Sequence, residues 1–359
     1  MKNNNKFFQY LSLFVLVTLF IVSVSCSQSW GQPSSFSIIS TRGQFDLETG
    51  KLVEGHNSTD YKSINIPDCP PEIAVVVHGF GLDDAKAAER FDRTLMSLQA
   101  NNYKIPLIGF SWDSDTPFSL VNPSISQQGW DIAKIIANKN GPLLAQFIID
   151  YKENCPNSDV RIIAHSLGAR VIFSALQSLL DDNQSIATND NNTDVKIIES
   201  VHLLGAAVDD EQASMSHLDC IFNIPPLTCS GKAIESEVEH FYNLFNPQDN
   251  MIAPTFFGTI PSVYKFNEDD EALGSFGADN IANTPSNYNQ TNVVGHIIVD
   301  IDANGDGNCD LPILWFGFEG CTVFLPGDNH FGYMGNRNFN DENVYDEGAI
   351  DVVVTDWRR

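Results

Sequence analysis

Basic residues are scarce in this chain: 20 Lys and Arg stand against 46 Asp and Glu among 359 residues, a formal net charge of −26. A protein that binds nucleic acid through a basic surface needs clustered Lys and Arg to neutralise phosphates, so that class is excluded. The same deficit argues against docking on an anionic membrane surface. Charged residues of both signs make up only 18% of the chain and hydrophobic residues 43%, which excludes wholesale disorder.

The cysteines contain no C-x-x-C pair, which argues against a zinc ribbon or a thioredoxin-like motif. Several pairings are open to the six cysteines that follow Cys26. Their spacing favours the two short-range pairs Cys220–Cys229 and Cys309–Cys321, and it leaves Cys69–Cys155 as a long-range link. Disulfides of this kind indicate an oxidising, extracytoplasmic compartment.

The N-terminus predicts such a destination. An apolar run from Phe7 to Val24 follows two lysines, and small residues come behind it, as in a secretory signal peptide over residues 1–26. A retained membrane anchor and lipidation of Cys26 are the alternatives. Ser23 disfavours lipidation, because a large aliphatic residue is expected there. We therefore expect a secreted or cell-surface protein, whose only membrane association is through this segment.

Apolar strands alternate with helices over most of the chain, which predicts an α/β fold with a mostly parallel central sheet and helices on both faces. No internal repeat is visible. The expected strands cover residues 73–77, 106–110, 160–164, 195–206, 239–245 and 321–325, and the expected helices cover 84–99, 140–151, 167–180 and 348–357. We expect an N-terminal extension at 27–70, with a hairpin at 43–55, and one domain at 71–359 with insertions at about 210–237 and 266–320.

A serine lies between one of these strands and the helix that follows it, in Ala164-His-Ser-Leu-Gly168. A turn this tight strains the serine backbone and needs small residues two positions before and after it. Such a turn presents the hydroxyl of Ser166 as a nucleophile at the carboxyl edge of the sheet. The alternative is a serine that only caps the helix.

A second turn, Val77-His-Gly-Phe-Gly81, closes the first buried strand. Acyl transfer passes through a tetrahedral oxyanion that needs two hydrogen-bond donors. We assign them to the backbone N–H groups of Phe80 and Leu167. The alternative is an ordinary glycine turn.

Together these segments resemble the α/β-hydrolase superfamily, in its lipase- and esterase-like branch. The resemblance is carried by the turns at 77–81 and 164–168, by Gly109-Phe-Ser-Trp-Asp113, by Phe245-Asn-Pro-Gln-Asp249 and by Asn329-His-Phe-Gly-Tyr333. It implies the α/β-hydrolase fold from about Glu72 to the C-terminus. It also implies the order serine, acid, histidine along the chain.

That order leaves two candidate bases and three candidate acids. His330 lies in a Gly/Asn/Asp loop after an expected strand, whereas His296 lies inside an apolar run, so we assign the base to His330. Asp249 follows the strand at 239–245 in the loop that the fold uses for the acid. Asp209 and Asp210, after the preceding strand, are its competitors. Each acid has the alternative of being a solvated loop carboxylate.

An acidic loop precedes His330 and has oxygen ligands at alternate positions, as calcium loops do. Its candidate ligands are Asp300, Asp302, Asn304, Asp306, Asn308 and Asp310. It lacks the bidentate glutamate that closes an EF-hand loop, so we expect weak, structural calcium binding. The alternative is an unoccupied acidic turn.

The sequence thus predicts an exported serine hydrolase of carboxylic esters, acting on a small-molecule or lipid ester and needing no cofactor for the chemistry. A peptidase or amidase, and a non-catalytic calcium-dependent surface protein on the same fold, are the alternatives. The natural substrate, the oligomeric state and the role of 210–237 as a lid are not predicted.

Overall fold

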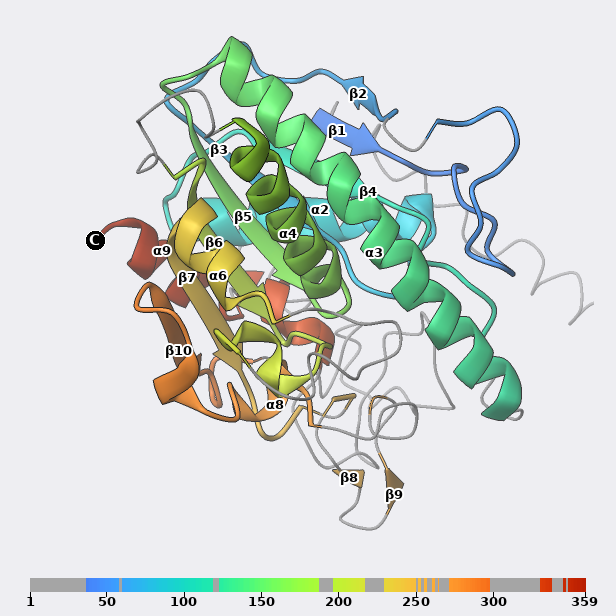
Figure 1. Ribbon diagram of the computed structural model, residues 1–359. Helices are drawn as coiled ribbons and strands as arrows, with labels where there is room; N and C mark the ends of the chain where they lie inside the picture. The colour runs from blue at the N-terminus through green and yellow to red at the C-terminus, as the bar shows by residue number, and fades with distance from the viewer. Residues whose placement is uncertain are drawn as a thin grey trace, which may run out of the picture. The chain divides into compact units, whose positions relative to one another are not determined.

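The computed structural model describes residues 37–57, 60–118, 123–186, 196–216, 229–249, 251–252, 255–256, 260–261, 264, 271–297, 330–337, 345–346 and 348–359. Its main feature is an eight-stranded sheet with the strand order β10-β7-β6-β5-β3-β4-β1-β2 (Figure 1). All neighbouring pairs are parallel except β1 and β2, which are antiparallel. The strands are β1 Ser37–Ser40, β2 Lys62–Ile64, β3 Glu72–Val77, β4 Leu107–Ser111, β5 Asp159–His165, β6 Ile198–Leu204, β7 Val238–Phe245 and β10 Tyr288–Asn292.

The remaining elements are helices and two short strand pairs. The helices are α2 Asp84–Ala100, α3 Pro123–Asn154, α4 Gly168–Ile186, α6 Gly231–Glu237, α8 Leu273–Phe276 and α9 Ile350–Trp357, with 3₁₀ turns η1 Asp210–Ala213, η2 Ile281–Asn283 and η3 His330–Met334. The short pairs are β8 Thr255–Phe256 with β9 Ile260–Pro261, and β11 Asn336–Arg337 with β12 Tyr345–Asp346.

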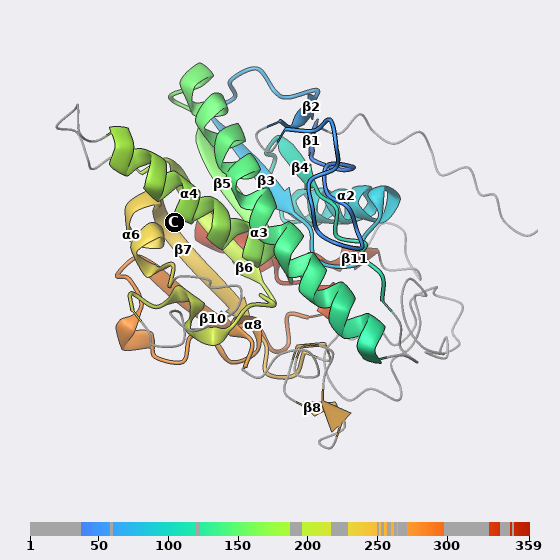
Figure 2. The same ribbon diagram turned by 45° about the vertical axis from the view of Figure 1, so that its right-hand side comes forward.

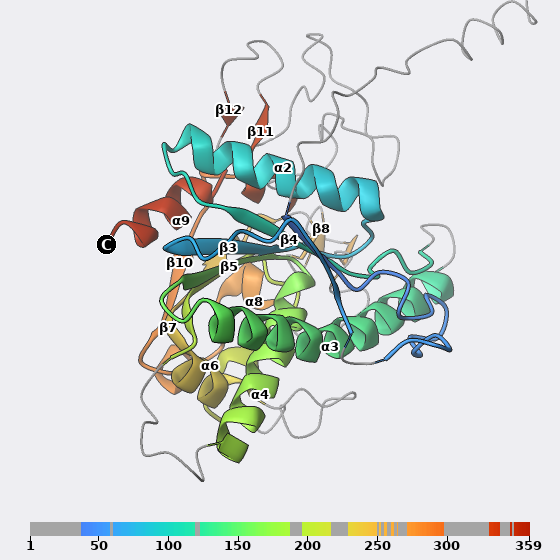
Figure 3. The same cartoon turned by 90° about the horizontal axis from the view of Figure 1, so that it is seen from above.

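Helices cover both faces of the sheet, as predicted. Seen from above, α3, α4 and α6 lie on one side and α2 and α9 on the other (Figure 3). Each side has its own apolar cluster, because alternate side chains of a strand point to opposite faces: Val75 and Val77 belong to the first cluster, Ala74 and Val76 to the second. The continuous apolar run at 73–77 is therefore buried on both faces, which is why it forms a central strand.

The predicted helices and central strands are present, with one large difference in length. Helix α3 begins at Pro123, far before the expected start at Asn140. Its early part carries Gly129 and several polar residues, so periodicity alone does not reveal it. In the structure α3 lies beside α4 (Figure 2), where Ser174 Oγ donates to the carbonyl of Asn138 at 2.6 Å. Tertiary packing therefore extends the helix.

Two segments that we expected outside the sheet contribute strands to it. The expected N-terminal extension at 27–70 contains β1 and β2, and β1 pairs in parallel with β4. The expected insertion at 266–320 contains β10, which pairs in parallel with β7. Polar residues dominate β10, so its sequence lacks the apolar pattern of a buried strand. The predicted hairpin at 43–55 is present, with a bridge between Phe45 and Leu52.

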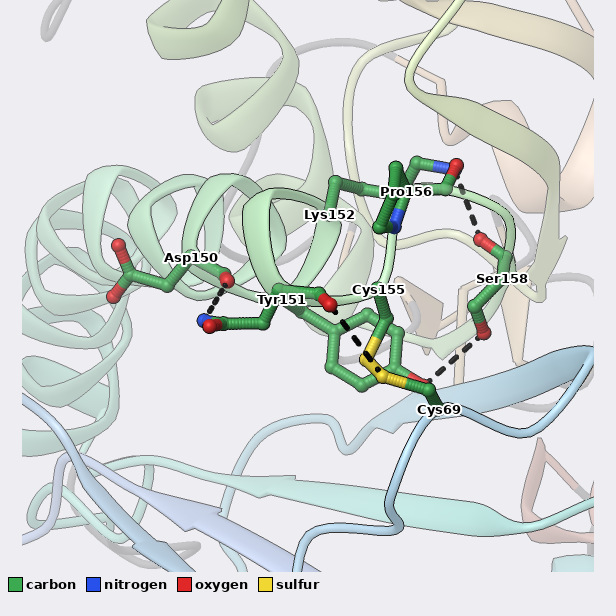
Figure 4. Close-up of a disulfide and its surroundings, with 8 residues drawn as sticks. Cys69, Asp150, Tyr151, Lys152, Cys155, Pro156 and Ser158 are labelled. Atoms are coloured by element: carbon green, nitrogen blue, oxygen red, sulfur yellow. Dashed lines mark hydrogen bonds between the residues drawn. A yellow bond between two sulfur atoms is a disulfide. The ribbon is translucent and has the colours of Figure 1, made fainter.

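A disulfide joins Cys69, just before β3, to Cys155, just after α3, as predicted (Figure 4). The Cα atoms lie 5.1 Å apart and the two cysteines are 86 residues apart in sequence. Cys229 is also disulfide-bonded. Its expected partner Cys220, the expected pair Cys309–Cys321 and the expected strand at 321–325 lie outside the described residues.

Candidate active site

Ser166 stands in the turn between β5 and α4, at the carboxyl edge of the sheet. Its φ of 56° lies in the left-handed region, which side chains rarely adopt and which costs roughly 1–3 kcal/mol. The serine N–H donates to the Leu204 carbonyl at 3.0 Å, and the serine carbonyl accepts from the N–H of Ala207 at 3.1 Å. The turn that follows comes so close to β3 that a Cβ on Gly168 would lie 2.7 Å from the Val77 carbonyl oxygen. A strained serine is held in place by backbone contacts.

Asp249 and His330 meet in the interior. The Nδ1 of His330 and the Oδ2 of Asp249 are 2.7 Å apart, and the carboxyl group is fully buried. A carboxylate only accepts, so Nδ1 carries the proton and Nε2 is left as the basic nitrogen of the ring. The second carboxylate oxygen accepts from the N–H groups of Met251 at 2.9 Å and Ile252 at 3.2 Å. These bonds fix the acid in the turn after β7.

The competing residues have other partners. His296 pairs with Asp351 of α9 at 2.9 Å, and both side chains are more than a third exposed. Asp209 is buried and accepts a hydrogen bond from the hydroxyl of Tyr264 at 2.6 Å. The structure brings Asp249 and His330 together, and it does not bring His296 or Asp209 to this pair.

His165 connects this pair to the serine turn. Its Nε2 lies 2.8 Å from the carbonyl oxygen of His330, and the two imidazole ring centres are 4.6 Å apart. Because His165 directly precedes Ser166, the contact brings the His330 segment against the serine turn. Acid, histidine and serine come from segments far apart in the chain.

The turn at 78–81 lies on the other side of Ser166. A Cβ on Gly79 would be 2.7 Å from the serine Cβ and 3.2 Å from its Oγ, so only glycine allows this approach. Within the part of the chain that the structure describes, no acceptor faces the backbone N–H of Phe80 or of Leu167.

The sequence motif places His78 in this turn, but it did not reveal the partners through which His78 holds it. The buried His78 donates from Nδ1 to the Gly79 carbonyl at 2.9 Å, and its Nε2 accepts from the backbone N–H of Trp112 at 3.1 Å. The Trp112 indole donates to the His78 carbonyl at 2.9 Å and stacks on the imidazole. Burial, and then the nearby Arg42, lower the pKa of His78 to about 3, so this ring is neutral at physiological pH.

The support extends into the N-terminal strands. Arg42 follows β1 and places its Nη2 3.3 Å from His78 Nε2 and 2.8 Å from the Leu82 carbonyl. The carboxylate of Asp113 accepts from the N–H groups of Gly43 at 2.9 Å and Phe45 at 3.1 Å. Trp112 and Asp113 belong to the Gly109–Asp113 segment of the resemblance, and Trp112 is fully buried.

The predicted calcium loop, residues 300–310, lies outside the described residues. Among those that are described, no group of three or more His, Cys, Asp or Glu side chains is arranged to hold a metal ion. None of the helices in the same part of the chain is long and apolar enough to cross a bilayer.

The strand order and the serine turn agree with what family comparison finds. Residues 63–233 match the sequence model of a family described as an alpha/beta hydrolase of unknown function (DUF900). This match covers just under half of the chain, and it agrees with the mostly parallel sheet that has helices on both faces. No curated protein matches it at a significant level.

Solved structures resemble this chain only remotely. They include a Trichoderma reesei cutinase in complex with a phosphonate inhibitor (17% identity, TM-score 0.25, 39% of this chain and 53% of the cutinase). A Listeria innocua protein, the lin2722 product, is 13% identical with a TM-score of 0.29, over 61% of this chain and 83% of that protein. A cutinase-like protein from Cryptococcus sp. is 12% identical with a TM-score of 0.27, over 64% of this chain and 80% of that protein. The chain spans about half the length of the Trichoderma cutinase. The assignment of the fold therefore rests on the family model and the sheet topology.

Proposed function

We propose that this protein is a serine hydrolase of carboxylic esters, with Ser166 as nucleophile, His330 as base and Asp249 as the acid that orients the base. The observation that carries the proposal is the buried Asp249–His330 contact of 2.7 Å beside a serine turn at positive φ. A serine hydroxyl is a weak nucleophile until a base takes its proton, and the base needs a fixed tautomer. The Asp249 contact supplies that tautomer.

The proposed reaction has two halves. Ser166 Oγ attacks the acyl carbon while His330 Nε2 takes its proton, and Asp249 stabilises the imidazolium that forms. The N–H groups of Phe80 and Leu167 donate to the oxyanion. The tetrahedral intermediate then breaks its bond to the alcohol, which leaves with the proton from His330. A water molecule, activated by the same nitrogen, hydrolyses the acyl-enzyme and restores the serine.

A fluorophosphonate probe tests the nucleophile, because it labels only an activated serine. We expect labelling of the purified protein and none of Ser166→Ala. The roles of base and acid are tested by matched pairs: His330→Ala against His296→Ala, and Asp249→Asn against Asp209→Asn. The first member of each pair should be labelled at least about 100-fold more slowly than the wild type, because general-base catalysis contributes about that much. The second member should be labelled at the wild-type rate. Equal labelling of wild type and Ser166→Ala would sink the proposal.

A panel of nitrophenyl esters of rising chain length, run against peptide amides, tests the substrate class. Turnover of esters with none of the amides supports an esterase, and preference for the amides overturns it in favour of a peptidase or amidase. Absence of both turnover and labelling would favour the non-catalytic surface protein.

We further propose that the protein is exported and that the acidic loop at 300–310 binds calcium. The Cys69–Cys155 disulfide supports export, because disulfides persist in oxidising compartments. Calcium at the loop would brace the chain upstream of His330 and take no part in the chemistry. Chelation should lower the melting temperature of the wild type but not that of Asp302→Asn/Asp306→Asn, and an unchanged wild type counts against the site.

A further inference from the structure

His165 is a buried titratable residue for which the proposed reaction has no use. It ends β5, directly before the nucleophile, and only 3% of its surface is exposed. Its ring faces three rings of the 3₁₀ turn η3: those of His330, Phe331 and Tyr333, with centres at 4.6, 6.2 and 6.0 Å. The residue before the serine therefore packs against the segment that begins with the base.

The polar contact between the two histidines fixes the proton of His165. The His330 carbonyl can only accept, so His165 Nε2, at 2.8 Å, carries the hydrogen. In His330 the proton is on Nδ1, toward Asp249. Burial holds the pKa of His165 well below its usual value, and the neighbouring His330 and Arg90 lower it further. The ring therefore stays a neutral donor and does not oppose charge on its neighbour.

The far end of η3 is held by other parts of the chain. Ser97 Oγ of α2 donates to the Met334 carbonyl at 2.7 Å, and the N–H of Ala349 donates to the Tyr333 carbonyl at 2.9 Å. At the near end, the backbone of His330 is tied by His165. Removing the His165 donor should release the base from the nucleophile strand while the rest of η3 stays attached.

We propose that His165 is a positioning residue: its Nε2–H holds the backbone of His330 and so sets the distance and angle at which the base meets Ser166. The proposal rests on the proposed function. It predicts a loss in the chemical step with binding unchanged, since a displacement of about 1 Å at a catalytic group can cost about 100-fold in rate.

The test compares two substitutions at His165 with the same two at a control position. His165→Phe keeps a ring of similar shape without the donor, and His165→Gln places an amide N–H near the position of Nε2. His202 is the control, because it is fully buried in the neighbouring strand β6, level with Ile163 of β5. On a nitrophenyl ester that the wild type hydrolyses, we expect His165→Phe to lose 10- to 100-fold in kcat with KM within twofold. His165→Gln should recover to within about fivefold of wild type, and both His202 variants should keep wild-type kcat.

A second readout does not depend on activity. The proton that His330 shares with Asp249 should give a far-downfield resonance in a histidine-labelled sample. It should persist in His165→Gln and in the His202 variants, and shift or vanish in His165→Phe. If the wild type neither labels nor turns over, the proposed function has failed, and this resonance alone decides whether His165 positions His330.

Three results would overturn the proposal. The first is a His165→Phe variant with wild-type kcat and resonance. The second is a loss of kcat in His165→Phe that His165→Gln does not recover, and the third is a loss of kcat of the same size in His202→Phe. If His165→Phe does not fold, His165→Asn replaces it, because the shorter amide cannot reach the place of Nε2. Equal activity of the Asn and Gln variants then contradicts the proposal, and activity of Gln alone supports it.

Discussion

At the scale of single residues, the candidate site depends on a strained serine backbone and on a close approach that leaves no room for a side chain larger than that of glycine. Ser166 adopts a positive φ, and Gly79 passes so near that its missing Cβ is what admits the serine side chain. The sequence motifs predicted both residues. The turn motif also contains His78, but it did not reveal the contacts with Trp112 and Arg42, from distant segments, through which His78 holds the turn at 78–81.

Gly79→Ala should impair the serine without unfolding the domain. The added Cβ would meet Ser166 Cβ at 2.7 Å and the His165 carbonyl at 3.0 Å, so the turn and the nucleophile must move apart. We expect the fluorophosphonate labelling rate to fall by about 100-fold, as misplacement of reacting groups does. Gly55→Ala is the control, because the added Cβ would have nothing within 4 Å and Gly55 takes no part in the contacts that hold the turn; its positive φ adds only local strain. Equal labelling of the two variants would show that the close approach does not matter.

At the scale of elements, parallel strands bring distant segments to one edge. β3, β5 and β7 all end where the turn at 78–81, the serine and the acid stand. The strands that the sequence did not predict lie at the two ends of the sheet: β10 at one end, β1 and β2 at the other. β10 and β2 are edge strands that pair on one side only and carry mostly polar or exposed residues, and β1 pairs with both β4 and β2 but is only four residues long, so apolar periodicity does not identify them.

The Cys69–Cys155 disulfide should stabilise the fold by linking the start of β3 to the end of α3. It closes a sequence separation of 86 residues, and the loss of chain entropy in the unfolded state is worth about 4.5 kcal/mol for a loop of that size. The double variant Cys69→Ala/Cys155→Ala should have a free energy of unfolding lower by about that amount, and it should therefore unfold at a lower urea concentration. The test is the free energy of unfolding of both proteins, each with and without reductant. The prediction would be contradicted if the free energy of unfolding of the wild type were the same with and without reductant and equal to that of the variant.

At the scale of the whole molecule, the acidic balance and the buried histidines affect stability in different ways. Protonation of carboxylates reduces the self-repulsion of a chain with net charge −26. His78, His165 and His202 are buried with lowered pKa values, chiefly because burial disfavours the charged ring. These three residues make the fold sensitive to mild acid.

Stability should fall as pH drops below about 6.5, the usual pKa of an unfolded histidine. Between that pH and the lowered pKa of the folded state, which is about 3 for His78, each of these histidines is protonated in the unfolded chain and neutral in the folded chain. Each such histidine contributes a slope of about 1.4 kcal/mol per pH unit. Urea unfolding between pH 7 and 5 checks this, with His202→Gln expected to show a shallower slope than wild type. Identical slopes would mean that His202 is protonated in the folded state too.

The central strands, the helices that cover them, the serine turn and the long-range disulfide could all be predicted from the amino-acid sequence. These features depend on local periodicity, on small residues in a tight turn and on cysteine spacing, all of which are readable along the chain. The side-chain pairs came from the folded structure, in which His330 meets Asp249, 81 residues away, while His296 meets Asp351 and Asp209 meets Tyr264. Likewise the folded structure decided that β1, β2 and β10 complete the sheet. One loop aspartate or histidine cannot be told from another in the sequence, because packing between distant segments determines which partner each side chain contacts.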